Sequence, residues 1–212
     1  MPDNLVTLVH VFIDHSNMWG GARGASRLKN PTLPDLSARV SIKHLDHILV
    51  GRRTGISTKI VSGGIPPAME GVWAEYQNHG YDTQRLVRDD AWRERGVDHT
   101  IIGHMWRLLA LHQTAPTLLI LASGDGKKNE FGTSFYELLR EVLTRDKYSS
   151  WRVQLASFDW THPNAHNLRS PTSSKMKGLV TSSDRGEFTN LFEHYDKVVY
   201  HKEWTPLKPG AV

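Results

Sequence analysis

The sequence LVTLVHVFIDHSN at residues 5–17 decides the fold of this chain. Residues 5–13 form an almost continuous apolar and β-branched run, which is typical of a strand buried on both faces of a sheet. Asp14 follows directly, at the point where such a strand ends. We therefore predict a central strand that leaves a carboxylate at its carboxyl end.

Strands and helices are predicted to alternate along the rest of the chain. Short apolar runs predict further strands over residues 58–62, 83–87, 117–122, 152–158 and 197–201. Helical spacing of apolar residues predicts helices over residues 34–49, from 66 onward, 98–112, 134–145 and 187–195. Residues 20–34 and about 160–186 are predicted as loops. This alternation indicates a mainly parallel sheet covered on both faces, in one domain over residues 1–212 with a short C-terminal tail.

Composition excludes several classes of protein. The chain has no cysteine, so disulfides, thiolate zinc sites and cysteine nucleophiles are excluded. No apolar stretch is long enough to span a bilayer, and the first residues do not resemble a signal peptide. We expect an intracellular protein, cytoplasmic or nuclear, that is not secreted and does not bind a membrane.

Positive charge is concentrated in one segment. The formal net charge of the chain is +4, and residues 21–53 hold seven basic residues against two acidic ones. Such an excess is typical either of a solvated surface or of a surface that binds a polyanion. The basic residues are Arg23, Arg27, Lys29, Arg39, Lys43, Arg52 and Arg53.

Four aspartates are predicted to lie at the carboxyl edge of the sheet. Asp14, Asp125 and Asp159 each follow a predicted strand, and Asp98 opens a predicted helix on its inward face. Open α/β sheets bind ligands at this edge, where the strand order reverses. Carboxylates that gather there without thiolates favour Mg²⁺ or Mn²⁺. Each acid also has a structural interpretation, as a turn residue or as a helix N-cap in the case of Asp98.

Three motifs in this order resemble those of NYN domains, in the PIN-like nuclease superfamily. VFIDHSN at 11–17 is similar to the family's opening motif, an apolar strand that ends in Asp with Asn three residues later. RGVD at 95–98 resembles its basic-Gly-Val-Asp segment. LILASGDG at 119–126 resembles its apolar strand followed by Ser-Gly-Asp. The order and spacing agree from about residue 8 to 159. The resemblance implies a three-layer α/β/α PIN-like, Rossmann-like fold with core strand order 3-2-1-4-5.

The resemblance also implies a divalent-metal-dependent endoribonuclease that hydrolyses RNA phosphodiester bonds. Asp14, Asp98 and Asp125 would bind Mg²⁺ or Mn²⁺, directly or through water. Asn17 would position the metal-bound water or a substrate phosphate, and Ser123 would support the site from the strand end. The expected partner is single-stranded RNA, and the oligomeric state stays open, a homodimer included. The remaining residues expected to contact substrate are Ser16, Trp19, Arg23, Arg27, Arg39, Lys43 and Lys127.

The chain departs from the family pattern at Lys127. Many relatives have a second acid two residues after the third aspartate, followed by Phe. Here that acid is replaced by Lys127, and Glu130-Phe131 is the candidate for a displaced equivalent, with Glu130 as a fourth metal ligand. A lysine beside the metals either binds a substrate phosphate or weakens metal binding. Both effects of Lys127 stay open from the sequence.

Two other functions remain as alternatives to a nuclease. The first is an RNA-binding or scaffold module of the same fold that has lost full metal binding, which Lys127 favours. The second is a hydrolase of small phosphoesters. No P-loop and no Gly-x-Ser-x-Gly nucleophile elbow is present. His162 and His166 have a spacing compatible with zinc, but no further ligands are suitably spaced.

Overall fold

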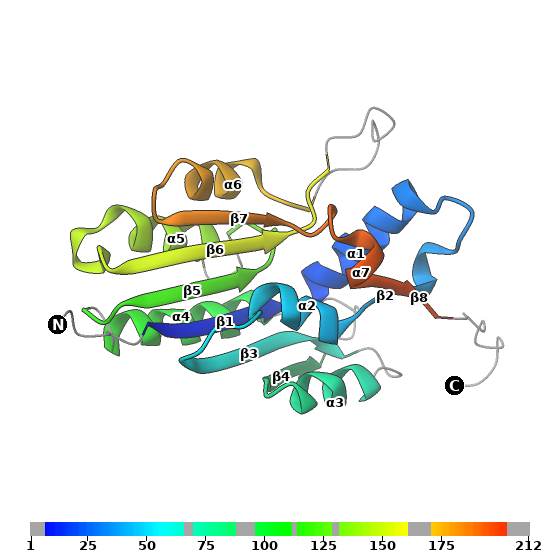
Figure 1. Ribbon diagram of the computed structural model, residues 1–212, viewed down its shortest axis with the longest axis horizontal. Helices are drawn as coiled ribbons and strands as arrows, with labels where there is room; N and C mark the ends of the chain where they lie inside the picture. Colours follow the sequence, from blue (N-terminus) through cyan, green and yellow to red (C-terminus); the bar gives the residue numbers. More distant parts are fainter. Residues whose placement is uncertain are drawn as a thin grey trace.

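Six parallel strands form the main sheet of the protein (Figure 1). The computed structural model describes residues 7–65, 70–87, 96–111, 114–128, 132–160 and 171–202. In spatial order the strands are β4 (Asp82–Val87), β3 (Ile56–Ile65), β1 (Leu8–Asp14), β5 (Thr117–Ala122), β6 (Trp151–Ser157) and β7 (Gly186–Asn190). All neighbouring strands run parallel. Numbered by their order in the chain, the first five strands of this sheet are β1, β3, β4, β5 and β6, and they take the predicted spatial order 3-2-1-4-5. Strand β7 adds a sixth strand at one edge.

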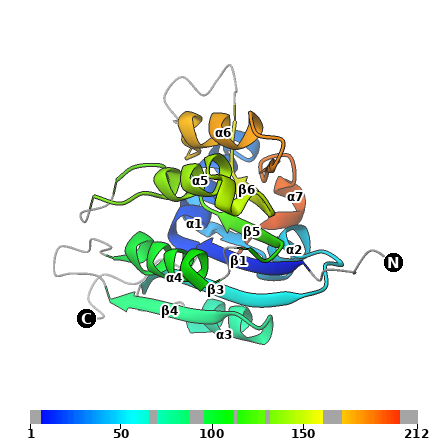
Figure 2. The same ribbon diagram turned by 90° about the vertical axis from the view of Figure 1, so that its left-hand side faces the viewer.

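Helices cover both faces of the sheet, which confirms the predicted three-layer architecture (Figure 2). One face carries α4 (Val97–Leu111), α5 (Phe135–Thr144) and α6 (Ser174–Thr181). The other carries α1 (His15–Lys29), α2 (Ile42–Leu49), α3 (Glu70–Asn78) and α7 (Tyr195–Val198). Along β1 the side chains alternate between two cores, with Phe12 on the α4 face and Ile13 on the α1 face. None of the helices in the described part is long and apolar enough to cross a membrane.

Helix α1 corrects the prediction of a loop over residues 20–34. The helix runs from His15 to Lys29 and passes the carboxyl ends of the strands (Figure 1). Its glycines, which suggested a loop, are largely packing residues. A Cβ at Gly21 would lie 2.5 Å from the Phe158 ring, and Gly24 packs equally closely on Trp160. Glycine is needed here because α1 approaches the end of β6 so closely, a contact that local sequence does not reveal.

The predicted helix over residues 34–49 is three elements instead of one. These are η1 (Asp35–Ser37), β2 (Ala38–Val40) and α2 (Ile42–Leu49). Strand β2 pairs antiparallel with β8 (Val199–His201), so that Arg39 lies opposite Tyr200. A partner about 160 residues away in the chain therefore decides the conformation of residues 38–40. Arg39, which falls in the predicted helix, therefore lies in β2.

The last third of the chain contains the other corrections. The predicted helix over residues 187–195 begins instead as β7, because pairing with β6 overrides local helical spacing, and residues 191–194 then form a turn before α7. The predicted strand over residues 197–201 is divided between α7 and β8. The predicted loop at about 160–186 contains α6. The start of a helix at Pro66 and the C-terminal tail from 203 lie outside the described residues.

The remaining predicted elements agree with the structure to within a few residues. The fourth predicted strand has the bounds of β5. Ser134 caps α5, since its hydroxyl accepts a hydrogen bond from the Glu137 amide at 3.2 Å. The short 3-10 turn η2 (Asp146–Tyr148) then leads into β6.

Gly21→Ala is expected to destabilise the protein, although alanine is the better helix former. The added methyl would overlap the Phe158 ring, and overpacking of this kind costs about 1–3 kcal/mol. Gly103→Ala, an exposed glycine of α4 with open space around it, is the matched control and should gain about 0.5–1 kcal/mol. Urea unfolding measures both variants. Equal stabilisation by both would contradict the close packing of α1.

Candidate functional site

The sheet changes direction between β1 and β5. From β1 the chain moves outward through β3 to β4, then returns to the other side of β1 and continues outward through β5, β6 and β7. The carboxyl ends of β1 and β5 thus form the topological switch point, which is where ligands bind in open α/β sheets. We call the residues at these two ends, Asp14, Asn17, Ser123 and Asp125, the switch-point site.

Asp14 is the centre of the switch-point site. Its side chain is only 4% exposed. One carboxylate oxygen accepts a hydrogen bond from the Asn17 amide at 3.0 Å, so that Asp14 is the N-cap of α1. The other oxygen accepts a hydrogen bond from the Ser123 hydroxyl at 3.2 Å. Asp14 therefore joins the end of β1, the start of α1 and the end of β5.

Hydrogen bonds also tie the Asp125 loop to α1. The Gly124 amide donates to the Asn17 side-chain oxygen at 2.7 Å. The Asp125 amide donates to the Ser123 hydroxyl at 3.3 Å, and the Asp125 carboxylate accepts from the Lys127 amide at 2.9 Å. Asn17 thus positions the loop through its oxygen, and Ser123 lies between the two aspartates.

A row of buried serines flanks Asp14 across the sheet. Ser62 of β3 lies beside Asp14 in register, and on the other side of β1, Ser123 follows β5 and Ser157 ends β6. All three are fully buried, and strand alternation places them on the α4 face together with Asp14. Sequence reasoning missed Ser62 and Ser157. A shared sequence pattern could have found them. In VSGG at 61–64, ASGD at 122–125 and ASFD at 156–159, serine is the second residue and comes at the end of an apolar run.

Glycines let the segment that leads into α6 pack against the Asp125 loop. A Cβ at Gly124 would lie 2.5 Å from the Pro171 carbonyl oxygen, and one at Gly126 would lie 2.6 Å from the Ser173 hydroxyl. The Ser173 amide donates to the Gly124 carbonyl at 2.8 Å. The turn around Asp125 is therefore shaped by the segment that leads into α6.

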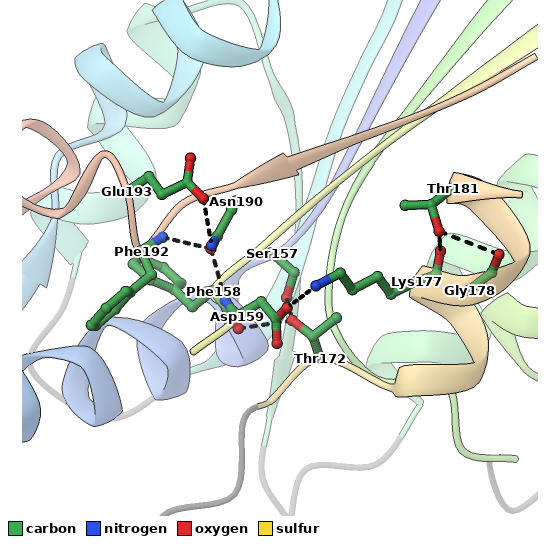
Figure 3. Close-up of polar contacts among 10 residues, drawn as sticks. All are labelled: Ser157, Phe158, Asp159, Thr172, Lys177, Gly178, Thr181, Asn190, Phe192 and Glu193. Atoms are coloured by element: carbon green, nitrogen blue, oxygen red, sulfur yellow. Dashed lines mark hydrogen bonds and ion pairs between the residues drawn. The ribbon is translucent and has the colours of Figure 1, made fainter. Parts of the chain in front are cut away.

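An ion pair anchors α6 to the end of β6 (Figure 3). Lys177 of α6 contacts the Asp159 carboxylate at 2.5 Å, and the Asp159 amide donates to Asn190 at 3.1 Å. The Thr172 hydroxyl lies 2.8 Å from both the Ser157 hydroxyl and the Phe158 carbonyl. Asp159, predicted to lie at the same edge as the other acids, thus pairs with a lysine.

Asp98 lies in the first turn of α4, the helix that packs on β3 and β1. It is half-buried and shares the inward stripe of Ile101, Ile102 and Met105. This position agrees with the prediction that the Asp98 side chain points toward the protein body. Glu130, the candidate fourth ligand, lies outside the described residues, as do His162 and His166.

The residues of the switch-point site fit a hard cation only in part. Asp14 and Asp125 supply carboxylate oxygens, and the buried Ser62 hydroxyl beside Asp14 has no hydrogen-bond partner among the described residues. Oxygen donors of this kind suit Mg²⁺ or Mn²⁺. However, within the described ranges no three His, Asp or Glu side chains come together as a metal-binding group. That Asp14, Asp98 and Asp125 bind metal, directly or through water, stays a prediction.

The fold divides the basic segment of residues 21–53. Arg39 donates to the carbonyls of Leu36 and Ala38, and Arg53 donates to Leu49 and to Gln154 of β6. These two arginines therefore brace the structure. Arg52 lies in the connection that enters β3 at its amino end, away from the switch point, and Lys43 is exposed in the first turn of α2.

The basic residues of α1 lie on the helix that starts at Asp14. Arg23 stacks over the Trp19 ring at 5.0 Å, and Lys29 lies over Phe192 at the same distance. Arg27 is exposed. Three of the seven basic residues in the segment, Arg23, Arg27 and Lys29, therefore lie on the helix that is capped by Asp14 of the switch-point site.

An aromatic cluster packs beneath the start of α1 on the opposite side of the sheet from Ser62. The His15 ring packs edge-on against Trp73 and Tyr76, and its Nδ1 atom is hydrogen-bonded to the Tyr76 hydroxyl at 3.2 Å. Burial lowers the pKa of His15 to about 4, so the imidazole is neutral at physiological pH. Burial, together with Glu75 and Asp14, raises the pKa of Tyr76.

Comparison with known proteins leaves the family open. No protein-family model matches the chain, and no curated protein matches it. Any functional assignment therefore depends on the geometry of the switch-point site and on the motifs that the sequence carries.

His15 is expected to make stability fall as the pH falls. The unfolded chain takes up a proton near pH 6.5, whereas folded His15 does so only near 4, so the stabilisation is complete above 6.5 and is lost between 6.5 and 4. Between pH 7.5 and 5 the loss should be about 2 kcal/mol. Urea unfolding at pH 7.5 and pH 5 measures this loss of stability. In His15→Gln the loss should be smaller than in the wild-type protein by about 2 kcal/mol. Identical losses in the two proteins would contradict a buried, neutral His15.

Proposed function

We propose that the protein is a divalent-metal-dependent endoribonuclease that cleaves single-stranded RNA at the switch-point site. The observation that carries the proposal is the buried Asp14 carboxylate, held at the carboxyl end of the central strand by the Asn17 amide and the Ser123 hydroxyl. This is where an open α/β sheet binds a ligand. The motifs around Asp14, Asp98 and Asp125 resemble those of NYN domains and support the same function.

The residues of the site would have distinct roles. Asp14, Asp98 and Asp125 are the proposed ligands of Mg²⁺ or Mn²⁺, with Glu130 as a candidate fourth. When bound, such an ion would supply an activated water molecule and stabilise charge on the phosphate. Ser123 and Asn17 would hold Asp14 and the Asp125 loop in place through their hydrogen bonds to these elements. Lys127 is exposed in the same loop, where it could contact a substrate phosphate.

A second candidate function is an RNA-binding module that does not cleave. The observation that favours it is the cation Lys127, exposed two residues after Asp125 in the loop that would bind the metal. The two aspartates of the switch-point site also serve structural roles, since Asp14 caps α1 and Asp125 accepts from the Lys127 amide. A basic helix beside such a site could bind RNA without any cation.

Purified protein with Mn²⁺ is expected to cleave single-stranded RNA, and Asp14→Asn should slow cleavage by on the order of a thousandfold. Asparagine keeps the acceptor that caps α1 but removes the charge that binds a cation. Asp82→Asn is the matched control, because Asp82 is exposed at the amino end of β4, on the opposite edge of the sheet. Cleavage by Asp14→Asn at the wild-type rate would place the activity elsewhere or in a contaminant.

Mn²⁺ is expected to stabilise the folded protein in a thermal melt. At ten times the dissociation constant the gain should be about 1.4 kcal/mol, since the ion binds the folded state only. Asp125→Asn should remove most of this gain while keeping the acceptor for the Lys127 amide. The absence of a shift in the wild-type protein at millimolar Mn²⁺ would favour the non-cleaving RNA-binding module.

A further inference from the structure

One side of α1, from half-buried Ser16 and Arg23 to exposed Gly20 and Arg27, begins at the switch-point site. Ser16, Gly20, Arg23 and Arg27 follow one another at positions i, i+4, i+7 and i+11, so they form a single stripe along the helix. Ser16 lies in the first turn, two residues after Asp14, with its hydroxyl 3.4 Å from the Gly64 amide. We call these four residues the α1 stripe. From Ser16 to Arg27 the stripe is about 16 Å long, at the usual rise of about 1.5 Å per residue.

Gly20 is the one residue of the α1 stripe that the fold does not explain. A Cβ at Gly20 would meet no atom within 4 Å, whereas Cβ atoms at Gly21 and Gly24 would collide with Phe158 and Trp160. An exposed glycine inside a helix costs about 0.5–1 kcal/mol relative to alanine. Gly103 and Gly178 are equally open, so openness by itself identifies no site. Gly20 differs in lying between Ser16 of the first turn and two arginines.

Trp19 lies beside Gly20 in a fixed orientation. Its indole N–H donates to the Ala38 carbonyl of β2 at 3.2 Å. The Arg23 guanidinium lies over the ring, 5.0 Å from its centre. Trp19 is half-buried, and its neighbour Gly20 is exposed. An ordered aromatic ring beside arginines is the usual platform for an unpaired base.

The charge of α1 matches a polyanion. The helix contains Arg23, Arg27 and Lys29 and no acidic residue. Arg27 and Lys29 are exposed, and Arg23 is half-buried. A nucleic-acid strand has the complementary charge, and glycine allows its backbone to approach a helix closely.

We propose that the α1 stripe is a binding track for a single strand of nucleic acid that runs outward from the switch-point site. Phosphates would contact Arg23 and Arg27, one unpaired base would stack on Trp19, and the strand would lie against the helix at Gly20. At a stacked spacing of about 3.4 Å per nucleotide the track would hold about four or five nucleotides. This inference rests on the proposed function, because it names the path by which the substrate of that site is held.

Gly20→Ala is the sharpest test, because its effects on stability and on binding should have opposite signs. The substitution should raise the melting temperature by about 2 °C, since alanine favours the helix and meets no atom. It should weaken binding of a fluorescein-labelled single-stranded RNA of about 12 nucleotides by about fivefold or more, because the methyl occupies the track. Fluorescence anisotropy in EDTA measures the binding without cleavage. Gly103→Ala is the matched control, and it should raise the melting temperature and leave binding unchanged.

Salt dependence tests the phosphate contacts independently. Arg27→Gln should weaken binding and reduce the slope of log affinity against log salt by about 0.7, the value for one phosphate of a single strand. Arg52→Gln removes another exposed arginine, in the connection that enters β3 at its amino end, and it should leave the slope unchanged.

The outcomes separate the track from the nuclease. Wild-type binding by Gly20→Ala would overturn the track, even if the protein cleaves RNA. If the wild-type protein never cleaves RNA but Gly20→Ala binds RNA more weakly than it does, the result would support the track and count against the nuclease. Duplex RNA of the same length should bind more weakly than the single strand, and equal or tighter binding of the duplex would overturn the single-strand assignment. Failure of the wild-type protein to bind the RNA would also overturn the track.

Discussion

The hydrogen bond between Asp14 and Ser123 is the interaction on which the proposed site depends. It links the carboxyl ends of β1 and β5, the two strands between which the sheet reverses its order. The same carboxylate caps α1 through the Asn17 amide. A buried carboxylate is tolerated only when its oxygens are satisfied, so the chain has to bring both donors to this point. The strand end, the helix start and the Asp125 loop are positioned together as a result.

Close packing of small residues completes this arrangement. Gly21 and Gly24 let α1 pass the ends of the strands against Phe158 and Trp160. Gly124 and Gly126 let the segment before α6 pack on the Asp125 loop. The Asp159–Lys177 ion pair then holds α6 to the end of β6. The shape of the site is therefore set from both sides, by α1 and by α6.

The fold also separates basic residues that are close in the sequence. Arg39 and Arg53 donate to backbone carbonyls and serve the structure, whereas Arg23 and Arg27 lie on α1, the helix that Asp14 caps. A cluster of positive charge in the sequence is therefore not one surface in the molecule. Of this cluster, only the residues on α1 lie on an element that starts at the acidic site. The proposal of a bound polyanion depends on these residues.

The sequence by itself determined the alternation of strands and helices and the place of Asp14, Ser123 and Asp125 at strand ends, and the family resemblance supplied the order of the five central strands. The alternation and the strand ends follow from local apolar patterns, which each segment carries within itself. Local patterns could not reveal α1, β2 or β7, because glycines packed on distant aromatic rings and strand pairing across the chain override local preference. Tertiary structure alone brought Ser62 beside Asp14, Lys177 to Asp159 and the Arg23 guanidinium over Trp19. It also decided that the acids of the described residues form no three-residue metal group, since distances between separate elements depend on how they pack.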